Sequence, residues 1–521
     1  MQFTLMIFSK TSDARKHRVG DQQPKGDSVF GLSKSRITSF EQCPKKLWLS
    51  VHKRELAETQ AGSELRFSGG NEVGDIACKL SPGGVMIEAQ PDLKVALKQT
   101  SELIAAGHRA PIYEATFSHD GVLIQADVLE PAGKSGWRMA EVKSSTGVKD
   151  YHLGDLATQV WVLEHCGIEL EAAAIRHIDN SFVLSTPNDY RGLLKDAPML
   201  EEVRQIAALR GEVVASAREM LAGSEPSLSM GAHCLKPFSC EFQAYCSKDM
   251  PPPPEWPIDV LPRVSRSFVE EMAKNGIHDL RDVPLEALKQ EQHRIVHQST
   301  VSGVTYHDPV AVAHKTKEWG FPRHYLDFET IALPVPAWIG AKPYQQVPFQ
   351  FSCHTEPTDG SIVHRSFLSI DGSDPRRQCA EALIECVGEA GSIIAYNASF
   401  ERSCVKGLAD ALADLSPELT AIAERFVDLL PVAQAHYYHA DQRGSWSIKK
   451  VLPTIAPDLD YSDLEVGDGV AAQLAWLEAR SAQCTPERRA QIAGFLETYC
   501  ERDTRAMVIL LRRMTGATEP I

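Results

Sequence analysis

Residues 122–145 read VLIQADVLEPAGKSGWRMAEVKSS, and this stretch predicts both a local fold and a site. Two short apolar runs flank a turn rich in proline and glycine, which is typical of a β-hairpin. Asp127 lies in the first run. Glu141 and Lys143 lie two residues apart in the second run, so their side chains leave the same face of a strand. Two acids and a lysine that face one another are costly unless a ligand lies between them. A divalent metal ion would take the carboxylate oxygens, and the lysine would meet a negative oxygen of the substrate.

Size and composition indicate a globular chain with several domains. Its 521 residues suggest two to four domains, and 43% hydrophobic and 24% charged residues are ordinary values. The longest apolar runs fall short of eighteen residues, so no membrane span is expected. Twelve irregularly spaced cysteines without a secretory signal indicate a reducing cytoplasm. A net charge of −15 argues against a protein that coats nucleic acid, but it is compatible with a nuclease, whose metal-binding carboxylates are acidic.

The hairpin is predicted to belong to an α/β unit over residues 31–250, preceded by a flexible arm over 1–30. After the arm, the apolar pattern that starts at Leu32 predicts a helix with Ser39 as its N-cap. Further helices are predicted at 92–107, 154–166 and about 200–222.

Three cysteines, Cys234, Cys240 and Cys246, follow one another with the spacing C-x5-C-x5-C. A tetrahedral thiolate site needs a fourth ligand, and Cys43 is the natural candidate. His233 could take that place instead, which would suit zinc better than an iron–sulfur cluster. The remaining cysteines lack such spacing and are predicted to be small buried apolar residues: Cys78, Cys166, Cys353, Cys379, Cys386, Cys404, Cys484 and Cys500.

The pattern D-x13-E-V-K-S-S, followed by a glutamine in ATQVWVL, resembles the core of the RecB-type PD-(D/E)XK nucleases. This resemblance implies that Asp127 and Glu141 are metal ligands, that Lys143 is the catalytic lysine and that Gln159 is the helix residue that follows. Members of that group often have an upstream histidine ligand, but the corresponding GNEVGDIACKL has none, so Glu72 or Glu114 would serve instead.

The early C-P-K-K-L-W-L with a late cysteine triplet is similar to the iron–sulfur members of the same group. In those proteins one N-terminal and three C-terminal cysteines hold a [4Fe–4S] cluster that joins the ends of the domain. The resemblance implies the same role for Cys43, Cys234, Cys240 and Cys246, with Zn²⁺ as the alternative.

Residues 251–320 change in character and are predicted to separate two domains. PPPPEWP is a stiff polyproline segment. The sequence that follows predicts a helix, a short Asn-Gly-Ile turn and a second helix. This is compatible with a hairpin that grips a phosphate backbone, and equally with a helical spacer.

Residues 321–521 predict a second α/β domain that begins with the strand HYLDFET. Asp327 and Glu329 project from one face of this strand, and further antiparallel strands are predicted at 345–356 and 362–370. Asn397 is predicted to cap a helix that carries Glu401. Near the end of the chain, Tyr499 and Asp503 lie one turn apart on a helix.

This second domain resembles the DEDD exonucleases, which have an RNase H-like fold of the DnaQ type. Asp327 and Glu329 match the first motif, and Tyr499-x3-Asp503 matches the tyrosine variant of the third. N-x-x-x-E at 397–401 stands where these enzymes have N-x-x-F-D, so Glu401 departs from the family pattern. GSWSIKKVLP at 444–453 is similar to the segment that follows their second motif.

The whole arrangement resembles a bacterial family of uncharacterised fused nucleases. It implies an enzyme that hydrolyses phosphodiester bonds with Mg²⁺ or Mn²⁺, in nucleic-acid repair, processing or defence. The expected substrate is single-stranded or end-exposed nucleic acid, DNA more than RNA, with exonucleolytic cleavage. A helicase or repair partner is compatible with the pattern but is not specified by it. The alternative is a non-catalytic nucleic-acid-binding scaffold with one or both nuclease cores degenerate.

Overall fold

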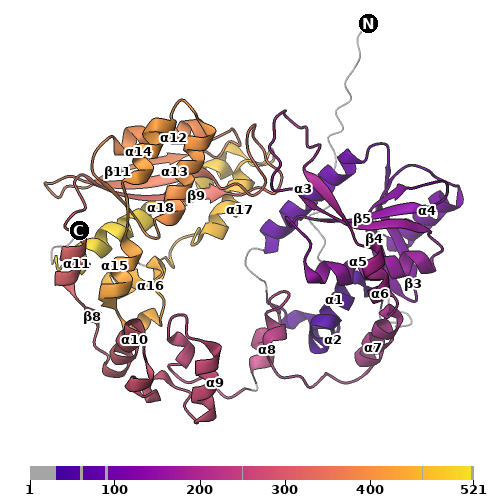
Figure 1. Cartoon of the computed structure of the whole chain (residues 1–521), viewed down its shortest axis with the longest axis horizontal. Coiled ribbons are helices and arrows are strands. Elements are labelled where there is room, and N and C mark those ends of the chain that lie inside the picture. Colours follow the sequence, from indigo (N-terminus) through magenta and orange to yellow (C-terminus); the bar gives the residue numbers. More distant parts are fainter. Residues whose placement is uncertain (1–30, 59–62, 89–91, 249, 460, 518–521) are drawn as a thin grey trace, which may run out of the picture.

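The structure is a computed structural model, and it shows a mixed α/β protein (Figure 1). Among the described residues there are eighteen helices and three sheets, of seven, five and two strands. None of these helices is both long and apolar enough to cross a membrane. The predicted arm, 1–30, lies outside the described residues. The residues that the structure describes are 31–58, 63–88, 92–248, 250–459 and 461–517.

The predicted hairpin is confirmed and forms the middle of the first sheet. The strand order is β2-β3-β4-β5-β6-β7, with β1 beside β4. Strands β3, β4 and β5 are antiparallel, whereas β5 and β6 are parallel and are joined by the helix α5, as a parallel connection requires. The strands are β1 (Leu32–Ser33), β2 (Val85–Met86), β3 (Ile112–His119), β4 (Val122–Pro131), β5 (Trp137–Lys143), β6 (Leu170–Ile178) and β7 (Leu194–Pro198).

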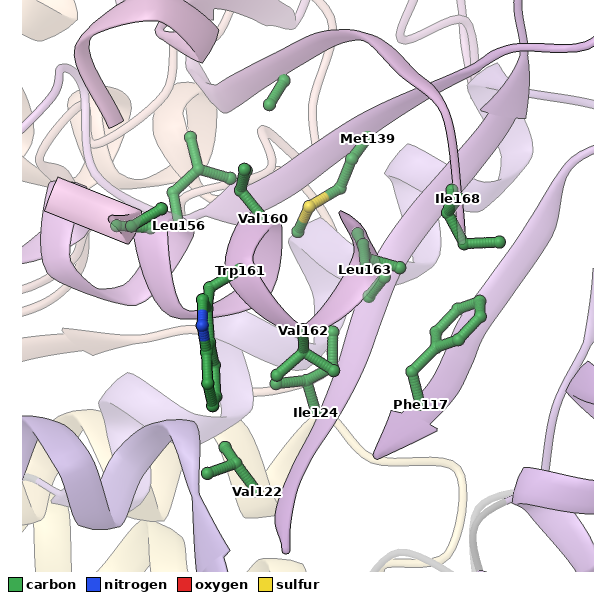
Figure 2. Packing of buried hydrophobic residues seen from close by; sticks show 14 of the residues in the cluster. Phe117, Val122, Ile124, Met139, Leu156, Val160, Trp161, Val162, Leu163 and Ile168 are labelled. Atoms are coloured by element: carbon green, nitrogen blue, oxygen red, sulfur yellow. The ribbon is translucent and has the colours of Figure 1, made fainter. Parts of the chain in front are cut away.

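The helix α5 (Asp150–His165) covers one face of this sheet and fixes its position (Figure 2). Its apolar residues Leu156, Val160 and Leu163 are fully buried in one cluster with Ile124 of β4 and Met139 of β5. Burial of each such side chain contributes about 1.5–3 kcal/mol. The packing holds the polar residues of α5 over the end of the hairpin.

The helix predicted from Leu32 is in fact two helices, and the prediction that Ser39 caps it was wrong. Ser33 is the N-cap, and its hydroxyl accepts a hydrogen bond from a backbone N–H of the first turn. Cys43 interrupts the helix with an extended backbone, because the proline that follows disfavours a helical conformation before it. The two helices are α1 (Lys34–Gln42) and α2 (Pro44–His52).

The other predicted helices of this part are present, with one difference. The helix predicted at about 200–222 is broken at Ala208 and Leu209 into two helices, and both bury apolar residues in the core around the first sheet. The remaining helices around the first sheet are α3 (Ser63–Leu80), α4 (Leu93–Ala105), α6 (Leu200–Ala207), α7 (Arg210–Ala222) and α8 (Gln243–Ser247).

The second sheet has the order β11-β10-β9-β12-β13, so the strand with the D-x-E pattern is central. Strands β9, β10 and β11 are antiparallel, as predicted, and β12 and β13 add parallel strands on the other side of β9. The strands are β9 (Arg323–Ile331), β10 (Val347–Glu356), β11 (Val363–Leu368), β12 (Ser392–Ala395) and β13 (Phe426–Asp428).

Helices cover both faces of the second sheet. One face packs on α12, α13 and α14, and the other on α15 and the long C-terminal helix α18. Because α18 lies against β9 and β10, its inner face is directed at the centre of the sheet. These helices are α12 (Arg376–Val387), α13 (Ser399–Ala411), α14 (Ser416–Glu424), α15 (Leu429–His436), α16 (Ile448–Ile455), α17 (Gly469–Ala479) and α18 (Pro486–Met514).

The segment between the two sheets contains one predicted helix and lacks another. The first helix ends at an Asn-Gly turn in which Gly276 has a φ of +76°, a conformation that glycine adopts without strain. The second helix was predicted directly after this turn, but two short 3₁₀ turns occupy that place. The helices here are α9 (Arg266–Lys274), α10 (Glu291–Ser302) and α11 (Pro309–Thr316), and β8 (Tyr306–His307) pairs with β14 (Tyr437–Tyr438).

Candidate functional site

Three predicted carboxylates meet at the centre of the second sheet. Asp327 and Glu329 alternate along β9, and Asp503 faces them from α18. One oxygen of each residue lies within 4.8 Å of one oxygen of both others. The sequence fixes this locally, because period-two alternation places the first two on one face, and the inner stripe of α18 supplies the third.

Burial makes this carboxylate cluster electrostatically unfavourable without a cation. Glu329 and Asp503 are each 8% exposed. Two unit charges 4.8 Å apart repel by about 3.5 kcal/mol at an effective dielectric constant of 20. Burial, and then the neighbouring Asp503, raise the pKa of Glu329 to about 8. The same causes raise the pKa of Asp327 well above its usual range. A divalent cation would relieve both the repulsion and the desolvation.

Glu401, the residue that departs from the family pattern, approaches the cluster from α13 without joining its closest group. It is 4% exposed, and its Oε2 makes no hydrogen bond in the described structure. Burial, followed by the charge of Asp428, raises its pKa to about 8. The predicted cap is wrong, because Ala398 occupies the N-cap position and Asn397 precedes it with a φ of +80°. A buried carboxylate oxygen without a partner is expensive, and it suits a metal ligand.

Two residues that sequence reasoning did not single out hold the tyrosine and the aspartate that resemble the third motif. The Lys449 ammonium donates to the Tyr499 hydroxyl at 3.1 Å. The Tyr461 hydroxyl donates to Asp503 Oδ1 at 2.5 Å. Burial, and then the charge of Asp503, raise the pKa of Tyr499 far above its usual value, so its hydroxyl keeps its proton. Lys449 lies in the GSWSIKKVLP segment, and this resemblance was the only sequence feature that could have indicated it. No sequence feature indicated Tyr461.

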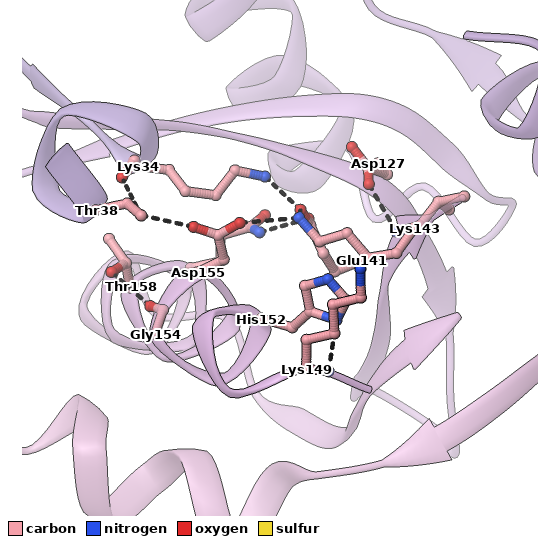
Figure 3. A network of polar contacts seen from close by, with 12 residues as sticks. Lys34, Thr38, Asp127, Glu141, Lys143, Lys149, His152, Gly154, Asp155 and Thr158 are labelled. Atoms are coloured by element: carbon pink, nitrogen blue, oxygen red, sulfur yellow. Dashed lines mark hydrogen bonds and ion pairs between the residues drawn. The ribbon is translucent and has the colours of Figure 1, made fainter. Parts of the chain in front are cut away.

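At the first sheet, Glu141 lies at the centre of a polar network that α5 and α1 complete (Figure 3). It accepts from Lys34 at 2.5 Å and pairs with Lys143 at 2.9 Å. Gln159, as predicted, lies beside it and donates to Glu141 Oε2 at 2.5 Å. Lys143 also pairs with Asp155 of α5 at 2.8 Å. Sequence reasoning missed Lys34 and Asp155, because neither belongs to the quoted pattern.

The two acids of this network have opposite electrostatic environments. Burial would raise the pKa of Glu141, but Lys34, Lys143 and the Gln159 amide hold it well below its usual range. Burial, and then the charge of Glu141, raise the pKa of Asp127 to about 8. Asp127 Oδ2 accepts only the Val142 N–H at 2.7 Å among the hydrogen bonds described. Glu141 therefore pairs directly with two lysines, whereas Asp127 makes no ion pair among those described and feels Lys34 only as a weaker, nearby charge.

A cavity of about 380 Å³ opens beside Asp127. Glu114 lines it, as the sequence allowed, and it lies opposite Asp127 with a φ of +54°, a strained value for a residue with a side chain. Asp75 of α3 lines the same cavity and was not predicted. Glu72 does not line it. Burial raises the pKa of Glu72, and the charge of Arg480, from the second part of the chain, partly opposes this rise. Asp127, Glu114 and Asp75 are thus the carboxylates that share this space.

The four predicted cysteines converge although up to 203 positions separate them. Cys43, Cys234, Cys240 and Cys246 line one small cavity, together with His233. They carry free thiols, and burial raises the pKa of Cys240 to about 11. Of the cysteines predicted to be buried, Cys166 is exposed and Cys78 and Cys484 are half-buried, whereas the buried ones are Cys353, Cys379, Cys386, Cys404 and Cys500.

Comparison with known proteins connects the chain to uncharacterised relatives. Residues 324–447, which include β9, match a family described as "Domain of unknown function (DUF2779)". The chain is 31% identical over 209 residues to "Uncharacterized protein MG366 homolog" of Mycoplasma pneumoniae (strain ATCC 29342 / M129 / Subtype 1), which covers 36% of this chain and 31% of that protein. It is 28% identical over 207 residues to "Uncharacterized protein UU173" of Ureaplasma parvum serovar 3 (strain ATCC 700970), with 35% and 30% covered. The chain therefore matches about a third of the length of these curated relatives.

One solved structure, described as "Crystal structure of SSO0001", overlaps 37% of this chain and 78% of its own. Its TM-score is 0.20 and its sequence identity is 14%, values too low to assign a common fold.

Proposed function

We propose that this chain is a metal-dependent nuclease that hydrolyses phosphodiester bonds in single-stranded or end-exposed nucleic acid, by exonucleolytic cleavage. The observation that carries this proposal is the buried group of Asp327, Glu329 and Asp503, whose oxygens lie within 4.8 Å of one another. An all-carboxylate donor set favours hard divalent cations such as Mg²⁺ or Mn²⁺ over softer metals. The residues present therefore fit the implied ions, and Glu401 would supply the fourth carboxylate.

The order of the second sheet supports an RNase H-like fold for residues 321–521. Its three antiparallel strands are followed by two parallel ones, and the first acidic pair lies on the central strand. In the same way, the hairpin and the α5 crossover support a PD-(D/E)XK core for residues 31–250. In this proposal residues 251–320 are the spacer between the two domains.

In the proposed mechanism, Asp327, Glu329, Glu401 and Asp503 would hold the ions, which when bound would supply an activated water and stabilise charge on the phosphate and on the leaving oxygen. The Tyr499 hydroxyl keeps its proton and orients the attacking water. Lys449, which donates to that hydroxyl, fixes the position of the tyrosine.

The first sheet would provide a second site of a different kind. Asp127, with Glu114 or Asp75 across the cavity, offers oxygens for an ion. Glu141 is the other ligand that the resemblance implies, and Lys34 and Lys143 now compensate its charge. Lys143 would place a positive charge beside the scissile phosphate. Gln159 orients Glu141 through its amide.

The four-cysteine cavity fits a [4Fe–4S] cluster or, as the alternative, Zn²⁺ held with or without His233. Iron and acid-labile sulfide analysis after anaerobic purification decides between them, with Cys240→Ser expected to lose the metal. Cys166→Ser is the matched control, because this exposed thiol lies outside the cavity. Stoichiometric zinc without iron would exclude the cluster.

A non-catalytic nucleic-acid scaffold is the second candidate, and one observation favours it for the first sheet. Lys34 occupies Glu141 Oε1 at 2.5 Å, which leaves this carboxylate less free to bind an ion. In this alternative the first domain clamps nucleic acid for another activity.

The deciding experiment is cleavage of end-labelled single- and double-stranded DNA and RNA in Mg²⁺ or Mn²⁺. Asp327→Ala and Lys143→Ala assign any activity to one site or the other, and Glu389→Ala, an exposed acid far from both, is the control. We expect Asp327→Ala to lose at least about 100-fold, because metal catalysis supplies several kcal/mol. If the chain binds these substrates but cleaves none of them, the nuclease function is refuted and the scaffold function is supported. Unchanged cleavage in both site variants would refute both site assignments.

A further inference from the structure

The two parts of the chain meet at a second place, far from the spacer that joins them in sequence. In Figure 1 this contact lies near α3 and α17, opposite α8 and the spacer helix α9. It is made by residues 332–346, the loop between β9 and β10, which begins three residues after Glu329. We call this segment the β9–β10 loop.

The β9–β10 loop is held firmly on the first part of the chain. Gly340 N–H donates to the Leu184 carbonyl at 2.7 Å, and Leu184 N–H donates to the Ala341 carbonyl at 3.0 Å. Val335 is buried in one apolar cluster with residues of α3 and β6. These contacts fix the position of the loop on the first part of the chain, so its exposed residues also have a defined position.

At the end of the loop, Tyr344 reaches the site at the first sheet. Its hydroxyl donates to the carbonyl of Ser144, the residue after Lys143. The side chain remains 38% exposed and lines a cavity of about 720 Å³. Lys143 lines the same cavity from the other side. A residue of the second domain therefore forms one wall of a groove beside the proposed catalytic lysine of the first.

The composition of this groove contrasts with the rest of the chain. Its lining includes Lys143 and Lys149, the hydroxyls of Ser145 and Thr146, and the ring of Tyr151, with no carboxylate. The whole chain has a net charge of −15. Lysines beside tyrosine rings are the composition by which proteins bind single strands, with phosphates on the cations and bases stacked on the rings.

The size of the groove suits a single strand. Its volume of about 720 Å³ is small for a nucleic-acid site. A few nucleotides of a single strand fit this space.

We propose that the β9–β10 loop completes a single-strand-binding groove beside Lys143, in which the Tyr344 ring stacks on a base and Lys149 binds a phosphate. This groove would be the substrate-binding part of the proposed nuclease, and it rests on that proposed function only in the catalytic role given to Lys143. It makes the first site incomplete without the second domain, because Tyr344 lies in the loop that follows β9, the strand that carries Asp327 and Glu329.

Equilibrium binding of fluorescein-labelled dT12 to the full chain in EDTA tests the groove without cleavage, with the dT12·dA12 duplex as comparison. Base stacking on an aromatic ring is worth enough that Tyr344→Ala should bind dT12 about 10-fold more weakly. Tyr344→Phe keeps the ring and should restore most of this binding. Lys149→Ala should reduce the salt dependence of log K by about 0.7, as expected for one phosphate contact, whereas the exposed Lys289→Ala should not.

Tyr190→Phe separates stacking from loop docking, because it removes only the hydrogen bond to the Pro336 carbonyl. The groove is refuted if the chain does not bind dT12, if Tyr344→Ala binds like the wild type, or if Tyr344→Ala and Tyr190→Phe lose binding equally. Tyr344-dependent binding by a chain that cuts no substrate would support the groove and remove the nuclease function. Cleavage by a chain whose binding of dT12 does not depend on Tyr344 would support the nuclease function and refute the groove.

Discussion

The two acidic sites of this chain have similar residues and opposite charge balance. At the second sheet, Asp327, Glu329 and Asp503 face one another. Burial raises the pKa of all three, and the neighbouring acids raise the pKa of Asp327 and Glu329 further. At the first sheet, Lys34 and Lys143 surround Glu141 and lower its pKa. The three acids of the second sheet share one nearby lysine, Lys449, and need an external cation, whereas Lys34 and Lys143 compensate the single Glu141 at the first sheet. Buried acids thus indicate a metal site where they outnumber the protein cations beside them.

The largest expected effect comes from Asp503→Asn, which should act in opposite directions on activity and on stability. Cleavage should fall at least about 100-fold, because a metal ligand is lost. At a pH above the raised pKa values of these acids, the metal-free protein should become more stable, by of the order of 1 kcal/mol, because one of three repelling acids becomes neutral. Cleavage kinetics and thermal melts in EDTA measure the two effects. A less stable metal-free variant would show that the three acids do not repel.

The next effect is stabilisation by the ion itself. Mg²⁺ or Mn²⁺ at 100 times its dissociation constant should stabilise the wild type by about 2.7 kcal/mol. Asp327→Asn should lose most of this gain, and Glu141→Gln should keep it, because Glu141 is already compensated. Thermal melts with and without the ion measure the difference. Equal gains in both variants would mean that the ion binds elsewhere.

Removal of Lys34, the α1 lysine that pairs with Glu141, should destabilise the protein. Lys34→Met leaves Glu141, 1% exposed, with Lys143 as its remaining cation. Breaking a buried ion pair costs about 3–5 kcal/mol, and the second lysine and partial exposure should reduce this to roughly 2 kcal/mol. Chemical unfolding of the full chain measures the loss. Lys98→Met, on an exposed helical pair, is the control and should stay within about 0.5 kcal/mol. No loss in Lys34→Met would refute the proposed charge compensation.

The smallest effect concerns the helix that carries Lys34. Ser33→Ala should destabilise the first domain by about 1 kcal/mol, because the hydroxyl caps α1. Ser39→Ala, inside the helix, should cost little or be neutral, because alanine is the best helix former. Each variant removes one hydroxyl group, so the two unfolding curves compare directly. Equal losses would contradict the observed cap.

Features that depend on neighbouring residues could be predicted from the sequence, whereas contacts between residues distant in the sequence could not. The hairpin, the central D-x-E strand and the Tyr499–Asp503 helix face were predictable, because periods of two and 3.6 residues determine them locally. Lys34 was not predictable as a partner of Glu141, since 107 positions separate the two residues. Asp75, Lys449 and Tyr461 were missed for the same reason. The cysteines are the exception, because regular spacing revealed three of them and only Cys43 required a distant pairing.

Backbone details were less predictable than the faces of the elements. Both Ser39 and Asn397 have side chains suited to a cap, but Pro44 and the left-handed backbone at Asn397 determine where the helices start. Such effects depend on one neighbouring residue or on tertiary packing, which periodicity does not contain.

The most direct test of the central claim is anomalous diffraction from crystals of the full chain soaked in Mn²⁺. We predict an anomalous difference peak bounded by Asp327, Glu329 and Asp503, and no peak at Glu141 Oε1, where Lys34 lies. Mn²⁺ bound elsewhere in the crystal, with none at these three carboxylates, would contradict the account.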